Sequence, residues 1–390
     1  MRLTRNRRGV EEIPMKIKEF VYSAQKHIEA HTDEKFKRTH IYELLAASFN
    51  YNSFAALCAE SILFHDEQLP KYEPHNLALR QRCVELGYTP ATADFVFDKL
   101  PAYIVEQKIT LVNISELISR LREELFYQDE HSEWNTDNYD DEIEDNTSLH
   151  QSDEDYEREL SPELLAELEI AAEKGNLHAH YALALSLAPD DDYEQNHGSD
   201  YWYTQQQQGR VLTGIEKEWA DNYSQSAHNI QKYEFHLREA ARLGDERAQL
   251  DLAENFNDPL FFEQPTKENT HDPLRVVEIA EDLDRLHDVH IWLTIAAKAG
   301  DINAMTRLIE EFDQDDLQRC WTWIYLAQLL KTDLTKDNHY AIHENGSHYD
   351  DDVGGNMYVG GQEGIKLPPL SEEQDILAHQ NAQSIYKKDK

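Results

Sequence analysis

The chain is 390 residues long, more than one hydrophobic core usually supports, so two or three folding units are predicted. Its 76 acidic residues outnumber its 37 basic residues, and the net charge of −39 disfavours nucleic acid and anionic membranes as partners. Apolar runs such as 291–297 are far too short for a membrane span. An acidic surface favours a basic partner, although solubility alone also explains the charge.

The first residues differ from the rest of the chain. Residues 1–14 are basic and then polar, lack the apolar block of a secretory signal, and predict a flexible start. Met15 opens an apolar-periodic stretch, so the fold is expected to begin there. Whether translation starts at Met1 or Met15 is left open, and a cytoplasmic location is expected.

Residues 15–127 predict a domain of short helices, beginning with Phe20, Ala24 and Ile28 at helical spacing. Ser53 is placed to cap a helix, and Gly87 to end one. Asn113, with Glu116 three residues later, resembles a capping box. The helix pair expected at 40–63 has the outline of a DNA-reading motif. Its second helix carries almost no side chains that read bases, so nucleic-acid binding is only an alternative.

Residues 128–160 predict a disordered acidic linker. The stretch 129–160 contains 14 acidic residues and one Arg, with no apolar period. This composition cannot bury enough apolar surface to offset the entropy of ordering.

The stretch 161–330 repeats itself. Three segments share an Ala-Ala pair, a Gly three residues after it, Asn or Asp next, and then Ala and Leu at fixed spacing. The alanines allow close helix packing, Gly ends one helix in a left-handed turn, and Asn or Asp caps the next. Each segment therefore predicts a helical hairpin, and stacked hairpins predict an irregular α-solenoid in an all-α protein. The residues that carry the pattern are Ala171, Ala172, Gly175, Ala240, Ala241, Gly244, Ala296, Ala297 and Gly300.

This pattern resembles the Sel-one-like repeat family, relatives of the tetratricopeptide repeats. The family places an aromatic residue four positions before the first Ala, where Trp292 stands, and Trp323 before Ala327 suggests a degenerate fourth copy without its Gly. The family's Gly-x-Gly turn is absent, and the copies are spaced more widely, with insertions at 188–210, 257–275 and 332–370. The resemblance implies a bacterial-type adaptor surface for proteins, without chemistry.

The end of the chain predicts a polar insertion loop at 331–370, in which 354–361 resembles a small hairpin. Ser371 is placed to cap a final helix in 371–390, which would close the solenoid and be followed by a short tail.

Few residues suggest chemistry. A divalent metal could use the loop 339–352, which holds His339, His343, His348, Asp350, Asp351 and Asp352. A solvated insertion loop is the favoured interpretation, because no helix fixes the geometry of these side chains. Tyr201, Trp202 and Tyr203 are candidates for partner binding, or alternatively cover the end of the first repeat. Cys58, Cys83 and Cys320 are expected to be buried free thiols.

These observations predict a non-enzymatic protein-interaction scaffold that needs no cofactor and binds a basic or extended protein segment along the inner face of the solenoid. A metal-dependent enzyme or regulator, and a nucleic-acid-binding regulator, are the alternatives.

Overall fold

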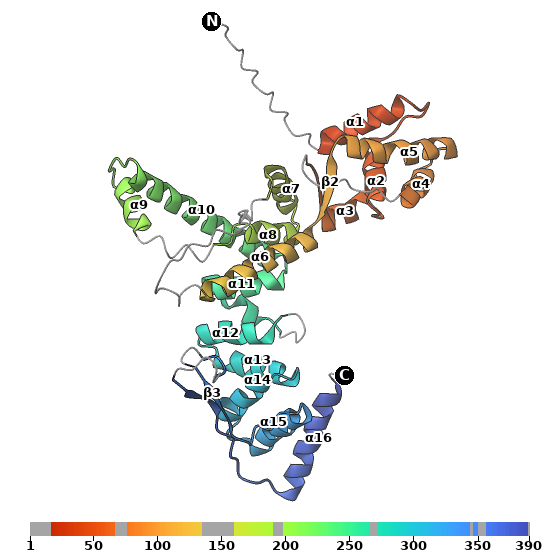
Figure 1. Cartoon of the computed structure of the whole chain (residues 1–390). Helices are drawn as coiled ribbons and strands as arrows, with labels where there is room; N and C mark the ends of the chain where they lie inside the picture. Colours follow the sequence, from red (N-terminus) through yellow and green to blue (C-terminus); the bar gives the residue numbers. More distant parts are fainter. Residues whose placement is uncertain are drawn as a thin grey trace. The chain divides into compact units, whose positions relative to one another are not determined.

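A computed structural model describes residues 17–66, 76–134, 160–189, 198–265, 271–343, 346–349 and 356–388. Helices dominate these residues, as predicted, and two small two-stranded sheets accompany them (Figure 1). The chain divides into two compact units, Met1–Leu252 and Ala253–Lys390. No helix within the described ranges combines the length and the apolar character that a bilayer crossing requires.

The N-terminal helices follow the predicted apolar spacing and caps. The Ser53 hydroxyl accepts a hydrogen bond from the Ala56 N–H at 3.1 Å, and Gly87 has a φ of 92°. The Asn113 side chain accepts from the N–H groups of Ser115 and Glu116. The helices are α1 (Ile17–Glu29), α2 (Arg38–Ser48), α3 (Phe54–Glu60), α4 (Asn76–Glu85), α5 (Pro90–Glu106) and α6 (Ile114–Trp134).

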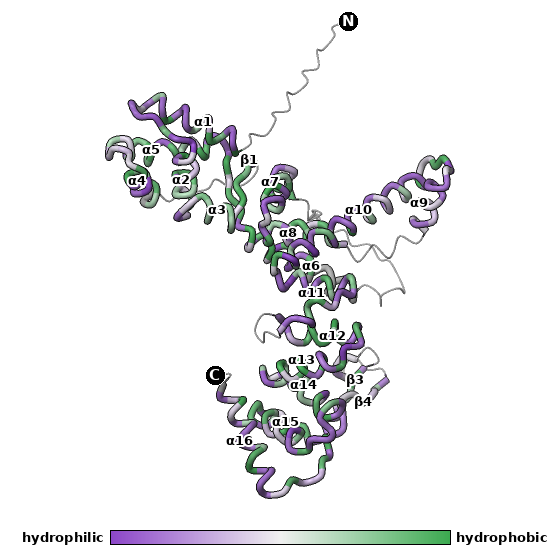
Figure 2. Tube along the Cα trace, turned by 180° about the vertical axis from the view of Figure 1, so that it is seen from behind, coloured by the Kyte–Doolittle hydropathy of each residue, from purple (hydrophilic) through white to green (hydrophobic). Residues whose placement is uncertain are grey.

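A two-stranded antiparallel sheet interrupts this domain. Strand β1 (Ser61–His65) follows α3 directly and pairs with β2 (Ile109–Asn113), with Leu63 opposite Leu111. The expectation of helix up to residue 63 is therefore wrong. Strand β1 contains three consecutive apolar residues, all at least 95% buried. A continuous apolar run is compatible with a strand and with a buried helix, so the pairing with a distant segment decides which of the two forms. Figure 2 shows the hydrophobic character of β1.

Helix α6 also continues to Trp134, past the predicted domain boundary at 127. The remainder of the predicted acidic linker, up to residue 159, lies outside the described residues, as does the predicted start at 1–14.

The three repeat segments each form two helices joined by the same turn. Gly175, Gly244 and Gly300 have φ values of 85°, 101° and 100°. In every copy, the Gly N–H donates to the second Ala carbonyl and the following N–H donates to the first, which is a Schellman motif. The predicted left-handed helix ends are confirmed. The helix pairs are α7 (Pro162–Glu173) with α8 (Leu177–Leu185), α10 (Ile215–Arg242) with α11 (Glu246–Phe256), and α13 (Leu286–Lys298) with α14 (Ile302–Arg307).

The predicted caps of the second helices are also observed. Asn176, Asp245 and Asp301 accept hydrogen bonds from backbone N–H groups three residues later, at 3.1, 3.4 and 2.7 Å. Each donor is the third alanine of its repeat, and these alanines are at most 1% exposed. The cap and the close helix contact are therefore made by adjacent parts of one motif.

Some helix ends use the same turn without glycine. Lys331, after α15 (Leu317–Leu329), has a φ of 73°, and the Thr332 N–H donates to the Ala327 carbonyl. Asp284, between α12 (Pro273–Asp282) and α13, has a φ of 54°. The turn at Lys331 ends the predicted degenerate copy. The turn at Asp284 was not predicted, because the sequence there has neither Gly nor an Ala pair.

Helix α15 packs on the last helix, α16 (Glu372–Lys388). Ser371 and Gln374 form a reciprocal capping box at its start, which confirms the predicted cap. Between α15 and α16, the segment predicted as a loop at 331–370 contains an antiparallel pair of strands, β3 (Asn338–Ile342) and β4 (Tyr358–Gln362). The hairpin expected at 354–361 is misplaced, because the strand partner of β4 is β3 and not its immediate neighbour.

We predict that Gly244→Ala lowers the free energy of unfolding by about 1–2 kcal/mol, because an L-residue is strained at positive φ. A Cβ at this position meets no atom within 4 Å, so backbone strain alone accounts for the loss. Urea denaturation measures it. Lys331→Gly relieves the same strain and is the control; a loss of stability in that variant contradicts the argument.

Candidate functional site

The candidate site is an open apolar groove of about 860 Å³ in the first unit. Helix α3 and strand β1 line one side, and α7 with the start of α8 lines the other. Its apolar surface comes from Tyr42, Phe54, Leu57, Ile62, Ile170 and Leu177, and its polar lining includes Lys18, Glu167, Lys174 and His178. Volume and apolar lining match those of ligand and peptide sites.

Helical spacing places the groove residues. Phe54 and Cys58 are four residues apart on α3 and lie on one helix face. Ile170 is on α7, and Lys174 is the residue that ends this helix. Ile170 is 37% exposed despite its aliphatic side chain. The groove therefore has apolar walls that the first unit does not cover with its own described residues.

Cys58 is exposed in this groove, so the expectation of a buried thiol is wrong for this residue. The partial burial that remains raises the pKa of its thiol, and Lys174 opposes this shift. Cys83 and Cys320 are buried as predicted, and burial raises their thiol pKa values to about 12 and about 11. Cys58 is thus the accessible thiol of the three.

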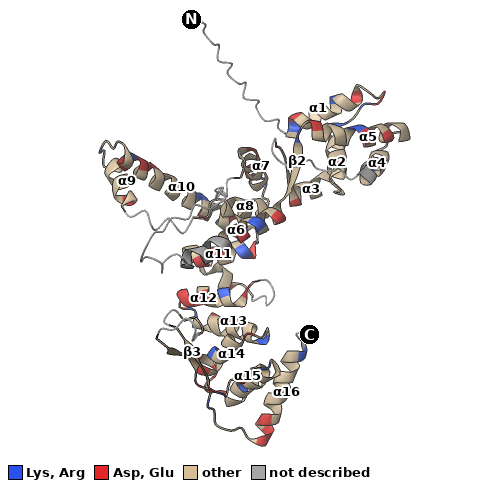
Figure 3. Ribbon diagram, in the orientation of Figure 1, with Lys and Arg blue, Asp and Glu red and all other residues tan. Residues whose placement is uncertain are grey.

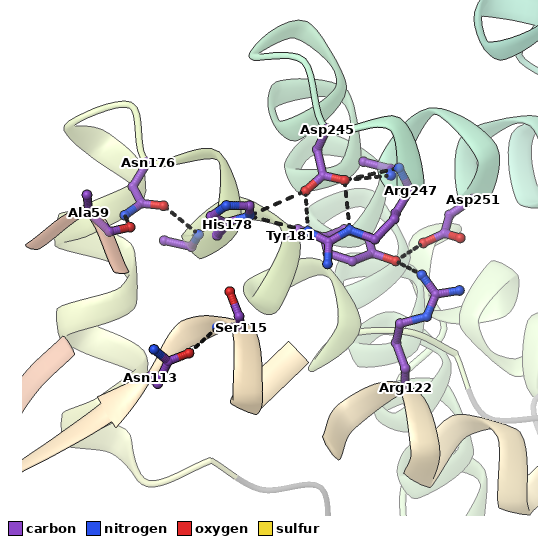
Figure 4. A network of polar contacts seen from close by, with 12 residues as sticks. Ala59, Asn113, Ser115, Arg122, Asn176, His178, Tyr181, Asp245, Arg247 and Asp251 are labelled. Atoms are coloured by element: carbon purple, nitrogen blue, oxygen red, sulfur yellow. Dashed lines mark hydrogen bonds and ion pairs between the residues drawn. The ribbon is translucent and has the colours of Figure 1, made fainter. Parts of the chain in front are cut away.

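Asn176 joins the two sides of the groove. Its Oδ1 accepts from the Ala179 N–H and caps α8, while its Nδ2 donates to the carbonyls of Cys58 and Ala59 at 3.2 and 3.1 Å (Figure 4). The other two repeats have Asp at this position, and a carboxylate has no N–H to donate. The amide therefore caps two helices that meet at the groove.

A polar network fixes α8 behind the groove. The Tyr181 hydroxyl donates to Asp251 at 2.7 Å and accepts from Arg122 at 2.6 Å, which connects α8 to α11 and α6 (Figure 4). The Arg247 guanidinium lies 4.7 Å from the Tyr181 ring centroid and pairs with Asp245 at 2.7 Å. Burial and the Asp251 charge raise the pKa of Tyr181. These groups satisfy one another, so their role is to position the helices.

A histidine pair connects α8 to α10. His180 and His236 have their Nδ1 atoms 3.0 Å apart, beside Glu239 and Arg242 in a cavity of about 430 Å³. Burial and His180 lower the pKa of His236 to about 4, and burial lowers that of His180. His236 stands four residues before Ala240, at the position where the repeat pattern has an aromatic residue.

The two tryptophans of the repeat pattern are both 3% exposed and belong to the core of the second unit. Trp292 stacks on Phe261, and the Trp323 indole N–H donates to Asp313 at 2.9 Å. Asp313 also accepts from His290 at 3.0 Å and pairs with Arg319 at 3.0 Å, so its buried carboxylate is satisfied.

The predicted partner-binding residues lie outside the groove, on helix α9 (Ser199–Gln207). Tyr201 is 52% exposed, whereas Trp202 and Tyr203 are half-buried. The Arg210 guanidinium covers the Trp202 ring at 4.9 Å, and Tyr203 contacts Tyr223 of α10 at a centroid distance of 5.2 Å. Tyr203 thus holds α9 on α10, and of the three aromatics only Tyr201 is largely open to a partner.

The metal alternative receives no support from the described part of the chain, where no three His, Cys, Asp or Glu side chains are placed to hold an ion. The rings of His348 and His343 lie against Tyr340 and Tyr349 instead. His339 is in β3, and Asp350, Asp351 and Asp352 lie outside the described residues.

Comparison with known proteins found no matching family model, no curated relative and no similar solved structure.

We predict that Asn176→Asp lowers the free energy of unfolding by about 1 kcal/mol, because it keeps the cap of α8 but turns a donor into a carboxylate facing two carbonyls. Asp301→Asn is the matched control: it has only a cap to preserve, and it is expected to change stability by less than about 0.5 kcal/mol. Urea denaturation of both variants measures the difference. Equal losses would contradict the double role of Asn176.

The histidine pair predicts that stability falls with acidification. The unfolded chain protonates His236 near 6.5 and the folded chain only near about 4. Protons therefore favour the unfolded state in this window, and the contribution is complete above pH 6.5. The Glu239 charge opposes the lowering of both histidine pKa values. Lys232 lowers the pKa of His236 further, and Arg242 lowers that of His180.

His236→Phe should remove about 1–3 kcal/mol of the stability difference between pH 7 and pH 4.5. Urea denaturation at the two pH values tests this. His228→Gln, at an exposed position on the same helix, is the control, and an equal pH dependence of the two variants would contradict the role of the histidine pair.

Proposed function

We propose that this protein is a non-enzymatic binding scaffold, and that the groove between α3 and α7 receives an apolar segment of a partner protein. The observation that carries this proposal is an open groove of about 860 Å³ with a half-exposed Ile170 and an accessible Cys58 on opposite walls. Side chains of this kind form the buried centre of peptide-binding sites.

The charges of the groove indicate which partner segment fits. Lys18 and Lys174 line it together with one carboxylate, Glu167, whereas the whole chain has a net charge of −39. A segment with apolar anchors flanked by acidic residues therefore complements this surface. This replaces the basic segment expected from the net charge, because the local charge of the groove has the opposite sign.

The helix pairs support a scaffold of the Sel-one-like type. Within the first unit, α8 packs on both α7 and α10, so the second helix of one pair contacts the first helix of the next. Within the second unit, α14 packs on both α13 and α15 in the same manner. Successive pairs of this kind are the unit from which a solenoid is built. We propose the family relationship on this basis.

The experiment uses Cys58 as the probe. A photo-crosslinker attached to this thiol identifies the segment bound in the groove, and the affinity of the corresponding synthetic peptide is then measured by calorimetry. We predict that Ile170→Glu weakens binding at least about tenfold, because it places a charge in the apolar wall. Leu286→Glu, at a 67% exposed position in the second unit, is the matched control.

The peptide should also slow the reaction of Cys58 with a small disulfide reagent. Peptide binding that is unchanged by Ile170→Glu, with Cys58 still reacting freely, would refute the groove as the binding site.

A further inference from the structure

The region from Gly198 to Lys232 forms an arm on the first unit. Helix α10 continues beyond its contact with α8, and α9 folds back along this outer part (Figure 1). Leu212 and Ala220, 6% and 0% exposed, are buried within the arm. The arm therefore has its own small core.

The arm exposes more apolar surface than its own packing uses. Val211 is 88% exposed, Ile215 54%, Tyr201 52% and Trp219 40%. Ile215 and Trp219 are four residues apart and lie on one face of α10, and Val211 precedes them in the connecting loop. Aromatic and aliphatic side chains exposed together are typical of an interface core.

Charge distinguishes the arm from the remainder of the chain. It holds four acidic and three basic residues, a balance of −1, and the other residues therefore account for −38 of the total of −39. Arg210 lies 3.7 Å from Glu216, and Lys217 lies 3.7 Å from Asp221, so the two charges within each pair compensate each other. Figure 3 shows acidic and basic residues interspersed along α10.

A near-neutral surface of this kind complements itself. Two copies of so acidic a chain repel one another wherever their acidic surfaces meet, and the arm is a place where they can approach. The exposed amides of Gln207 and Gln208 both donate and accept hydrogen bonds, so they can pair with the same residues of another copy. A two-fold contact requires a patch that matches itself.

We infer that the arm is a self-association surface, through which two copies of this chain pair arm to arm. The exposed side chains of Tyr201, Val211, Ile215 and Trp219 form the apolar centre of the contact. This site is separate from the groove, and the inference does not depend on the proposed function.

Sedimentation equilibrium of the full chain tests the inference. The wild type should form a concentration-dependent dimer. Raising the salt concentration from 50 to 500 mM should increase the dimer fraction, because salt screens repulsion between the acidic surfaces while the contact itself is neutral. Val211→Asp, at a position too exposed to affect folding, should weaken the dimer at least about tenfold by placing two like charges in the contact.

Leu286→Asp, which adds the same charge at a 67% exposed position outside the arm, is the control and should dimerise as the wild type does at 500 mM salt. Tyr201→Asp is the second arm variant, and its circular dichroism spectrum should match that of the wild type. A chain that is monomeric at all concentrations, or a dimer that Val211→Asp and Tyr201→Asp leave intact, or one that salt dissociates, would overturn the inference.

Discussion

The structure depends on one backbone device, a left-handed residue that ends a helix immediately before the cap of the next. At Gly175, Gly244 and Gly300 the chain reverses in a few residues, because glycine alone adopts this conformation without strain. The terminal carbonyls of the first helix and the first N–H groups of the second are both satisfied within the turn. In this way α7 packs on α8 and α13 on α14, and the buried alanines allow these helices to approach closely.

Helix α8 shows how these turns lead to a binding surface. It packs on α6, α7 and α10, and Tyr181 anchors it through Arg122 and Asp251. Its cap, Asn176, also holds the end of α3, so the first repeat and the N-terminal domain meet along a defined line. The groove lies beside this line, with α3 and β1 on one side and α7 on the other.

Local chemistry was readable in the sequence. Ser53, Asn113 and Ser371 cap helices because their side chains reach backbone N–H groups two or three residues away, whatever lies elsewhere in the chain. Long-range pairing was not readable. Strand β1 forms because Ile62 and Leu63 find partners nearly fifty residues later, and a short apolar run does not reveal such a partner.

The sequence by itself determined the helical pairs, their turns and the strongly acidic character of the chain, since these depend on neighbouring residues and on composition. It also indicated the exposed Tyr201, although its neighbours are half-buried. Only the tertiary structure decided that Cys58 faces a groove, that Lys174 gives this groove a basic character, and that His236 meets His180. Each of these depends on side chains from distant segments, and their meeting is set by how the packed helices are placed.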